Sequence, residues 1–217
     1  MLKAVILDFD GVIIDSELVW FDIYVDWLKK NLNYNLVMEE FLLCVGANYE
    51  KLFQALEQKN NFIIDREKFL TDTTQKFIDL SDQLPAKEGV VDFIKSVKDA
   101  GLKLSLATSA VRAKPIKHLT RFGLIDYFDF IVTADDVERI KPHPDLFLKA
   151  LEKLKVEKEE AIIFEDSQNG VLAANRAGVK VIVVPNDVTK HSKHENYEGK
   201  VNSLSEVNIA KLVSNFK

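Results

Sequence analysis

The chain has 217 residues, of which 47% are hydrophobic and 29% are charged, so it can bury the core of one large domain or of a domain with a smaller insert. Its formal net charge of −5 argues against nucleic acid as a partner, and no apolar run approaches the roughly 18 residues of a membrane span. The single cysteine, Cys44, predicts no internal disulfide, and the apolar run before Asp8 is too short for a signal peptide, so we expect a cytoplasmic protein.

The first predicted strand is the apolar run AVIL at residues 4–7, which ends in the motif DFDG. This motif places Asp8 and Asp10 two positions apart at the end of a buried strand, where their carboxylates should repel each other. Gly11 follows directly behind them. The spacing is therefore unfavourable unless something positive lies between the two side chains.

Residues 15–83 contain helical patterns and no strand pattern. The predicted helices cover residues 16–31, 38–44, 48–59 and 65–80. The first of them carries a stripe of aromatic residues at helical spacing, formed by Trp20, Tyr24 and Trp27. Such a stripe is typical of core packing. We therefore predict an all-helical domain inserted after the first strand.

From residue 86 onward, strand and helix patterns alternate. Four further apolar runs are typical of strands buried on both faces, at residues 102–108, 129–134, 161–165 and 180–184. Amphipathic helices lie between them, and three of these end at a glycine: Gly101, Gly123 and Gly178. The pattern predicts a doubly wound, Rossmann-like α/β core with a parallel sheet, formed by residues 1–14 and 84–217 around the helical domain at 15–83.

Two segments near the end of the chain carry smaller predictions. Residues 186–200 are polar and are therefore predicted to form a surface loop. His191 and His194 have a spacing that could suit a metal, but no third ligand lies nearby, so the surface loop is the preferred interpretation. The last helix is predicted to begin at a capping box made by Ser203 and Glu206.

The polar residues of most interest follow the predicted strands. In chain order they are Asp8, Thr108 with Ser109, Lys141, and Glu165 with Asp166. In an open parallel sheet, ligands bind outside the carboxyl ends of the strands, so these side chains are expected to meet at one edge. Any one of them could be a helix cap or a solvated charge, but the coincidence at four strand ends indicates a site.

Carboxylates crowded at one edge are tolerable if a cation lies among them, which accounts for the spacing of Asp8 and Asp10. Carboxylate and carbonyl oxygens are the ligands that Mg²⁺ prefers. A lysine and a hydroxyl on the other side can hold phosphoryl oxygens, which leaves one carboxylate to attack and another to move a proton. Gly11 has no side chain, so backbone N–H groups can approach an anion there.

Four motifs, in this order, resemble those of the haloacid dehalogenase-type phosphohydrolases: DFDGV at 8–12, ATS at 107–109, KPHPD at 141–145 and EDSQNG at 165–170. The helical insert after the first motif resembles the cap domain of the β-phosphoglucomutase and phosphoglycolate phosphatase branch. The resemblance covers essentially the whole chain.

This resemblance implies a role for each catalytic position. Asp8 would attack phosphorus and become an aspartyl phosphate, and Asp10 would protonate the leaving oxygen and then activate water. Thr108, Ser109 and Lys141 would bind the phosphoryl oxygens.

The resemblance also implies a magnesium site. The carboxylates of Asp8 and Asp166 and the backbone carbonyl of Asp10 would hold Mg²⁺, and Glu165 would be a direct or a water-mediated ligand. The supporting residues would be Gly11, Ser167 and Asn169.

A signalling receiver domain gathers similar groups, but such a domain is about half as long and places its lysine after the last acidic ligand. A sugar phosphomutase of the same branch is the stronger alternative. It would carry a cap histidine ten positions after Asp10 and an arginine in the next cap segment. This chain has Trp20 at the first place and no arginine within 45–52, and Arg112 is expected at a solvated helix start.

Hydrolysis is therefore the preferred prediction. The substrate is expected to be a small phosphorylated metabolite, namely a sugar, polyol or nucleotide phosphate, and the sequence does not choose among these. We expect the protein to be a monomer or a weak dimer, with no nucleic acid or membrane as a partner.

Overall fold

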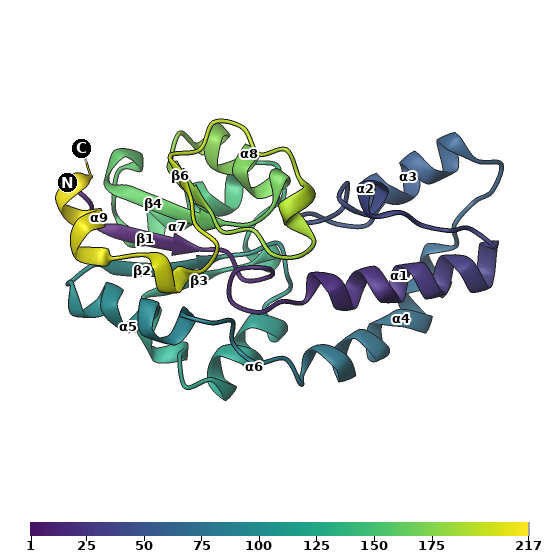
Figure 1. Ribbon diagram of the computed structural model, residues 1–217, viewed down its shortest axis with the longest axis horizontal. Helices are drawn as coiled ribbons and strands as arrows, with labels where there is room; N and C mark the ends of the chain where they lie inside the picture. Colours follow the sequence, from purple (N-terminus) through teal and green to yellow (C-terminus); the bar gives the residue numbers. More distant parts are fainter. Residues whose placement is uncertain (217) are drawn as a thin grey trace.

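The computed structural model describes residues 1–216, and a six-stranded sheet forms its centre (Figure 1). The strand order is β3-β2-β1-β4-β5-β6, and every neighbouring pair is parallel. The strands are β1 (Ala4–Leu7), β2 (Lys103–Ala107), β3 (Phe130–Val132), β4 (Ala161–Glu165), β5 (Lys180–Val183) and β6 (Gly199–Lys200). The first five confirm the predicted strands. The sixth was not predicted, because its two residues lie in a polar stretch without an apolar run.

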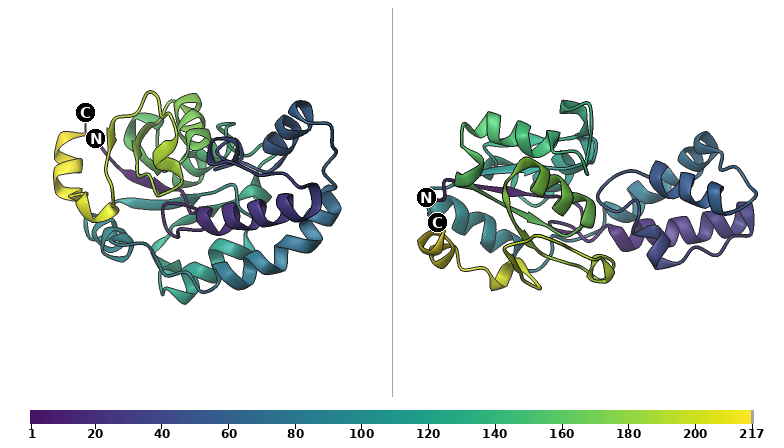
Figure 2. Two further views of the ribbon diagram at one scale, coloured as in Figure 1. Left: turned by 45° about the vertical axis from the view of Figure 1, so that its right-hand side comes forward. Right: turned by 90° about the horizontal axis from the view of Figure 1, so that it is seen from above.

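Helices cover both faces of this sheet (Figure 2), as a continuous apolar strand pattern requires. Successive residues of β1 point to opposite faces, so Val5 and Leu7 join one buried cluster while Ala4 and Ile6 join another. The first cluster includes residues of α5 (Val90–Asp99), α6 (Ala113–Arg121) and α9 (Ile209–Asn215). The second includes residues of α7 (Asp145–Leu154) and α8 (Gln168–Ala177). The doubly wound α/β prediction is confirmed.

Short 3₁₀ helices complete the core. They are η1 (Ile125–Tyr127), η2 (Ala134–Asp136), η3 (Lys158–Glu160), η4 (Thr189–His191) and η5 (Leu204–Glu206).

The chain between β1 and the rest of the sheet is helical, as predicted, and α1 to α4 extend from one end of the core (Figure 1). These helices are α1 (Glu17–Leu32), α2 (Met38–Phe41), α3 (Glu50–Lys59) and α4 (Arg66–Ser81). They enclose their own cluster of buried aromatic and aliphatic residues, centred on Tyr24, Phe53 and Phe69. The inserted stretch therefore has a separate hydrophobic core, while the exact limits of the domain, 15 and 83, remain a prediction.

Two connections join this helical region to the sheet, and Lys87 ties them together. The backbone N–H of Lys87 donates to the carbonyl of Ile13 at 2.9 Å, and its ammonium donates to the carbonyl of Gly11 at 2.6 Å. The Gly11 N–H in turn donates to the carbonyl of Ile14 at 2.7 Å. The outgoing and returning chains are thus fixed to each other at the base of the helical region.

The prediction for the start of the last helix is wrong. Ser203 accepts a hydrogen bond from the N–H of Ser205 and begins the short η5 turn instead. The α9 helix starts later, where the Asn208 side chain accepts from the N–H of Lys211 at 2.9 Å. Asn208 is as good an N-cap as serine, which accounts for the later start of α9.

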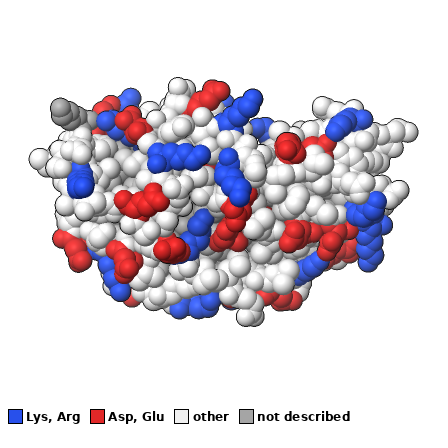
Figure 3. All heavy atoms as spheres, in the orientation of Figure 1, with Lys and Arg blue, Asp and Glu red and all other residues white. Residues whose placement is uncertain are grey.

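Positive and negative side chains are interspersed on the face shown in Figure 3. Within residues 1–216, no helix is both long enough and apolar enough to cross a membrane.

Candidate active site

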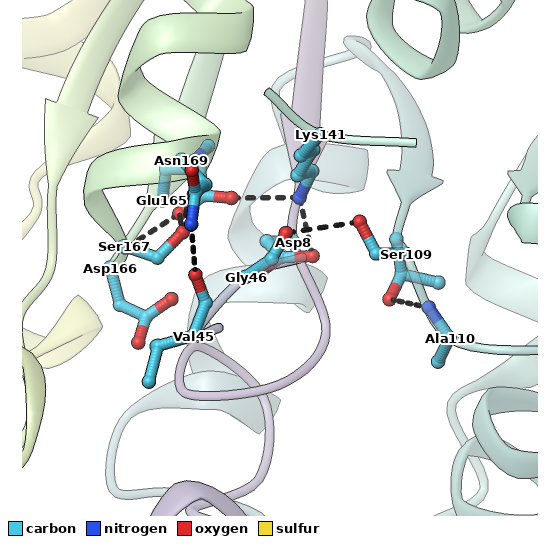
Figure 4. A network of polar contacts seen from close by, with 12 residues as sticks. Asp8, Val45, Gly46, Ser109, Ala110, Lys141, Glu165, Asp166, Ser167 and Asn169 are labelled. Carbon is cyan, nitrogen blue, oxygen red and sulfur yellow. Dashed lines mark hydrogen bonds and ion pairs between the residues drawn. The ribbon is translucent and has the colours of Figure 1, made fainter. Parts of the chain in front are cut away.

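The predicted residues converge at the carboxyl edge of the sheet, where the helical region meets the core (Figure 4). Asp8 lies directly after β1, and Thr108 lies directly after β2. Lys141 reaches the same point from the segment between β3 and α7, and Glu165 is the last residue of β4. The four strand ends identified in the sequence therefore form one group in space.

Lys141 lies at the centre of this group and is 1% exposed. Its ammonium is 2.7 Å from Asp8 Oδ1 and 2.7 Å from Glu165 Oε1. Burial alone would lower the pKa of Lys141, but the adjacent carboxylates of Asp8 and Glu165 outweigh it and hold that pKa above its ordinary value. The lysine is therefore a fixed positive charge between two buried acids.

Three buried carboxylates, those of Asp8, Glu165 and Asp166, offer oxygens that all lie within 4.8 Å of one another. Burial raises the pKa of Asp8 to about 8 although Lys141 opposes the shift, and burial with the charge of Glu165 raises the pKa of Asp166. One lysine cannot balance three acids in a buried site, and a divalent cation with oxygen ligands would supply the missing charge. The donor set therefore fits Mg²⁺.

Asp166 is held by two residues that the sequence did not identify. Asn186 donates from Nδ2 to Asp166 Oδ2 at 2.7 Å, and His194 Nε2 lies 2.7 Å from the Asp166 carbonyl oxygen. Asn186 is fixed in turn, because its Oδ1 accepts from the N–H groups of Val188 and Thr189, both at 2.9 Å. The predicted surface loop is therefore wrong in part, since two of its residues pack against the carboxylate cluster.

Gly11 occupies the place beside Asp166 where no side chain fits. A Cβ atom there would lie 2.0 Å from Asp166 Oδ2 and 2.7 Å from Asn186 Nδ2, and the backbone φ is +78°. The glycine predicted to admit an anion also makes room for an acidic side chain.

Ser167 supports Glu165 rather than the reaction itself. Its N–H and its hydroxyl both donate to Glu165 Oε2, at 2.7 and 3.0 Å. The same hydroxyl accepts from the N–H of Gly170 at 3.0 Å and so caps α8. Both oxygens of Glu165 are thus engaged, one by Lys141 and the other by Ser167.

Asn169 and Ser109 face the helical region. Asn169 donates from Nδ2 to the carbonyl of Val45 at 2.8 Å, and the Ser109 hydroxyl donates to the carbonyl of Gly46 at 3.1 Å. Gly46 fits tightly, because a Cβ atom there would lie 2.0 Å from Ser167 Oγ. The loop at 45–46 is therefore docked on the core by residues from two of the predicted motifs.

The Thr108 side chain accepts from the N–H of Ala110 at 3.1 Å and is 1% exposed. This bond fixes the turn after β2, so that the hydroxyl of Thr108 and the adjacent backbone border the cavity beside Asp8.

Asp10 is contacted by two donors on the same oxygen. The Ser16 hydroxyl and the Lys114 ammonium both bond to Asp10 Oδ1. Within residues 1–216, no hydrogen bond or ion pair engages Asp10 Oδ2, and Asp10 lines the cavity. Lys114 also lies over the ring of Phe77, 4.6 Å from its centroid. Lys114 had not been identified from the sequence, because a lysine in an amphipathic helix usually faces solvent.

A cavity of about 670 Å³ lies between the carboxylates and the helical region. Its far wall is largely aromatic, and Trp20 stacks on Phe77 there with ring centroids 3.9 Å apart. The aromatic stripe that was predicted to pack in the core is therefore only partly buried. Tyr24 and Trp27 are 6% and 7% exposed, whereas Trp20 is half-buried at the cavity wall.

The cavity lining contains two acidic residues that the sequence did not identify, Glu17 and Asp82. Glu17, the first residue of α1, is 6% exposed and lines the cavity. Burial, with the charge of Asp10, raises the pKa of Glu17 to about 8. Arg112 lies outside the cavity lining, at the start of α6 as expected, and pairs with Asp136 at 2.5 Å.

This arrangement places a buried carboxylate, a fixed ammonium, a second carboxylate with a free oxygen and a cluster that fits a cation around one end of the cavity. These are the parts that transfer of a phosphoryl group to a carboxylate requires. The aromatic end of the cavity has room for the group that carries the phosphate.

Comparison with known proteins agrees with this chemistry. The family model for haloacid dehalogenase-like hydrolases matches residues 5–184. The Bacillus subtilis (strain 168) protein YhcW, whose name describes it provisionally as a phosphatase, is 35% identical over 214 residues, which are 98% of this chain and 97% of YhcW. A Thermotoga maritima protein named phosphorylated carbohydrates phosphatase is 32% identical over 184 residues, 83% of this chain and 84% of that protein.

Among solved structures, β-phosphoglucomutase from Clostridium difficile has a TM-score of 0.81, with 22% identity, and the match covers 100% of this chain and 97% of that one. At this level of identity the likeness concerns the fold alone.

Proposed function

Because this chain belongs to the haloacid dehalogenase-like hydrolase family and is a phosphatase of its helical-cap subfamily IA, we propose that it is a Mg²⁺-dependent phosphomonoester hydrolase that uses Asp8 as its nucleophile. The observation that carries the proposal is the buried group of Asp8, Lys141, Glu165 and Asp166 at one end of the cavity. We further propose that residues 15–83 act as the cap over this group.

In the first step, a carboxylate oxygen of Asp8 attacks phosphorus in line and the bond to the leaving oxygen breaks. The leaving oxygen takes a proton from Asp10, which gives the alcohol and an aspartyl phosphate. Asp10 suits this role because it lines the cavity, and because Ser16 and Lys114 hold its Oδ1 while Oδ2 has no protein partner within the described residues.

In the second step, Asp10 removes a proton from water, and the water oxygen attacks phosphorus. The bond between phosphorus and the Asp8 oxygen breaks, so that inorganic phosphate forms and the Asp8 carboxylate is restored. Lys141 and the hydroxyls and N–H groups around Thr108 would stabilise the charge on the phosphoryl oxygens throughout both steps.

Asp8, Asp166 and the backbone carbonyl of Asp10 would hold Mg²⁺. When bound, the ion supplies positive charge that the acidic cluster lacks and that the phosphoryl oxygens require. Glu165 would act through a water molecule, because Lys141 and Ser167 already occupy its two oxygens.

A small phosphorylated metabolite is the proposed substrate. The name of the Thermotoga maritima relative favours a phosphorylated carbohydrate within that class. Transfer to a second position of a sugar, as in a mutase, is disfavoured because Trp20 stacks on Phe77 where that reaction would need a cap residue to hold a second phosphate.

The test is release of phosphate from a panel of sugar, polyol and nucleotide monophosphates, with Mg²⁺ and with a chelator. We expect turnover only with the metal. β-Glucose 1-phosphate with a trace of the 1,6-bisphosphate is included, and efficient formation of glucose 6-phosphate with little free phosphate would overturn the proposal. Turnover that survives complete removal of divalent metal would also contradict it.

A further inference from the structure

Glu17 is a buried carboxylate without a partner. It lies at the start of α1 and is 6% exposed. Within residues 1–216, no group donates a hydrogen bond to its carboxylate and no cation forms an ion pair with it. An ionisable side chain that is buried in this way costs free energy unless it meets a donor. Because Glu17 lines the cavity, water or a bound ligand can supply that donor.

The cations of the cavity are already engaged elsewhere. Lys114 contacts Asp10, and Lys117 contacts Asp82. These are the only lysines that line the cavity, and no arginine lines it within the described residues. A second anionic group on the substrate would therefore face Glu17 and find no free counter-charge.

The remaining wall of the cavity is apolar and aromatic. Trp20 and Phe77 form a stacked pair, with Tyr24 edge-on to Trp20. Such a surface packs against the C–H groups of a neutral ligand, and a single polar group within it fixes orientation. Among the acidic residues of this lining that the structure describes, Glu17 is the one that no hydrogen bond or ion pair engages.

We infer that Glu17 is a specificity-determining residue, whose carboxylate accepts hydrogen bonds from the hydroxyls of a neutral, polyhydroxylated leaving group. The preferred substrates are then sugar or polyol monophosphates, and substrates with a second phosphate, including pyrophosphate, are rejected. This inference rests on the proposed phosphatase function and narrows its substrate.

The test compares Glu17→Gln with the unaltered protein on fructose 1-phosphate, sorbitol 6-phosphate, fructose 1,6-bisphosphate and 4-nitrophenyl phosphate. The unaltered protein should favour the two monophosphates of polyhydroxylated groups over the bisphosphate. At pH 9, above the raised pKa of Glu17, Glu17→Gln should lower kcat/KM for those two by roughly tenfold to a hundredfold, mainly through KM, since a hydrogen bond to a charged group is lost. Turnover of 4-nitrophenyl phosphate, which has no hydroxyl to offer, should stay within about threefold.

Asp22→Asn is the matched control, because it also removes one negative charge from α1 but from the exposed face of that helix, outside the cavity lining. It should change none of the ratios between substrates. A thermal melt at pH 9, above the raised pKa of Glu17, adds a readout independent of activity, and Glu17→Gln should melt no lower than the unaltered protein there, since it removes an unpaired buried charge.

Three results would overturn the inference. They are equal losses on all four substrates in Glu17→Gln, bisphosphate turnover as efficient as monophosphate turnover in the unaltered protein, and a marked drop in Tm, which would make Glu17 structural. Absence of turnover on every substrate, 4-nitrophenyl phosphate included, would instead defeat the phosphatase proposal itself.

Discussion

The two ends of the cavity are built on different principles. At the core end, ionisable groups from separate strands are packed so tightly that each fixes another, and Lys141 touches two acids at 2.7 Å. At the cap end, aromatic rings from α1 and α4 make the wall, and Glu17 stands without a partner. A tightly interconnected polar network suits chemistry common to many substrates, while an unpaired acidic group in an apolar wall suits discrimination among them.

This comparison predicts that changes at the core end affect all substrates alike and that changes at the cap end affect only some. The largest effect is expected for Asp8→Asn, which keeps the shape of the side chain but removes the attacking charge. Turnover of every phosphomonoester should fall by roughly 10⁴-fold or more. Initial rates of phosphate release measure it, with Asp22→Asn on the exposed face of α1 as the control. Retention of more than a few per cent of activity would show that another residue attacks.

A smaller and more selective loss is expected for Asp10→Asn. A general acid contributes roughly 10²–10⁴-fold, and it matters most when the leaving oxygen is basic. Alkyl phosphates should lose activity far more than 4-nitrophenyl phosphate, whose leaving group needs little protonation. Steady-state kcat on both classes of substrate measures this difference. Equal losses on the two classes would argue against proton transfer by Asp10.

The third expected effect concerns Asn186, which fixes one oxygen of Asp166. Asn186→Ala should weaken Mg²⁺ binding by about 10–100-fold, as loss of a residue that orients a metal ligand usually does. The midpoint of the rise in Tm with Mg²⁺ concentration measures affinity without any turnover. His191→Ala, in the same loop, serves as the control. An unchanged midpoint in Asn186→Ala would mean that the 186–200 loop does not support the metal site.

The smallest effect is a pH dependence at the cap end. The pKa of Glu17 is raised from 4.5 to about 8 by burial, so the folded protein holds this proton more tightly than the unfolded chain does. Its contribution to stability is therefore present below pH 4.5 and is lost as pH rises toward 8. The Tm of Glu17→Gln minus that of the unaltered protein should grow between pH 5 and 8. Each kcal/mol of unfolding free energy that the unaltered protein loses should add about 2–4 °C to this difference.

The matched variant Glu39→Gln, on the surface of α2, should show no such trend. A constant difference in Tm across this pH range would mean that Glu17 is solvated in solution.

The sequence predicted the core end of the cavity far better than the cap end. Asp8, Thr108, Lys141 and Glu165 each follow an apolar run, and parallel strands bring such positions together whatever the loops do. Five strands and the helical insert followed from the same periodicity. The proposed roles of these residues remain predictions.

The residues that were missed have no such signal. Lys114 and Glu17 are charged residues on amphipathic helices, where a charge usually faces water. Asn186 and His194 lie in a polar stretch that has the composition of a surface loop, and only the fold turns them toward Asp166. Trp20 lies at the helical spacing that is typical of core residues, but it lines the cavity, so no neighbouring side chain buries it completely. Each of these errors arose where a tertiary contact overrode a local pattern.

The hydrogen bonds by which Lys87 joins the two connections have a consequence for product release. Since Lys87 bonds the carbonyls of Gly11 and Ile13, we expect the helical region to open by tilting about the residues beyond these two bonds. During each tilt the docked loop at 45–46 must lose its bonds to Ser109 and Asn169 and then form them again. We therefore expect the frequency of this tilting to set an upper limit on turnover for substrates whose chemistry is fast.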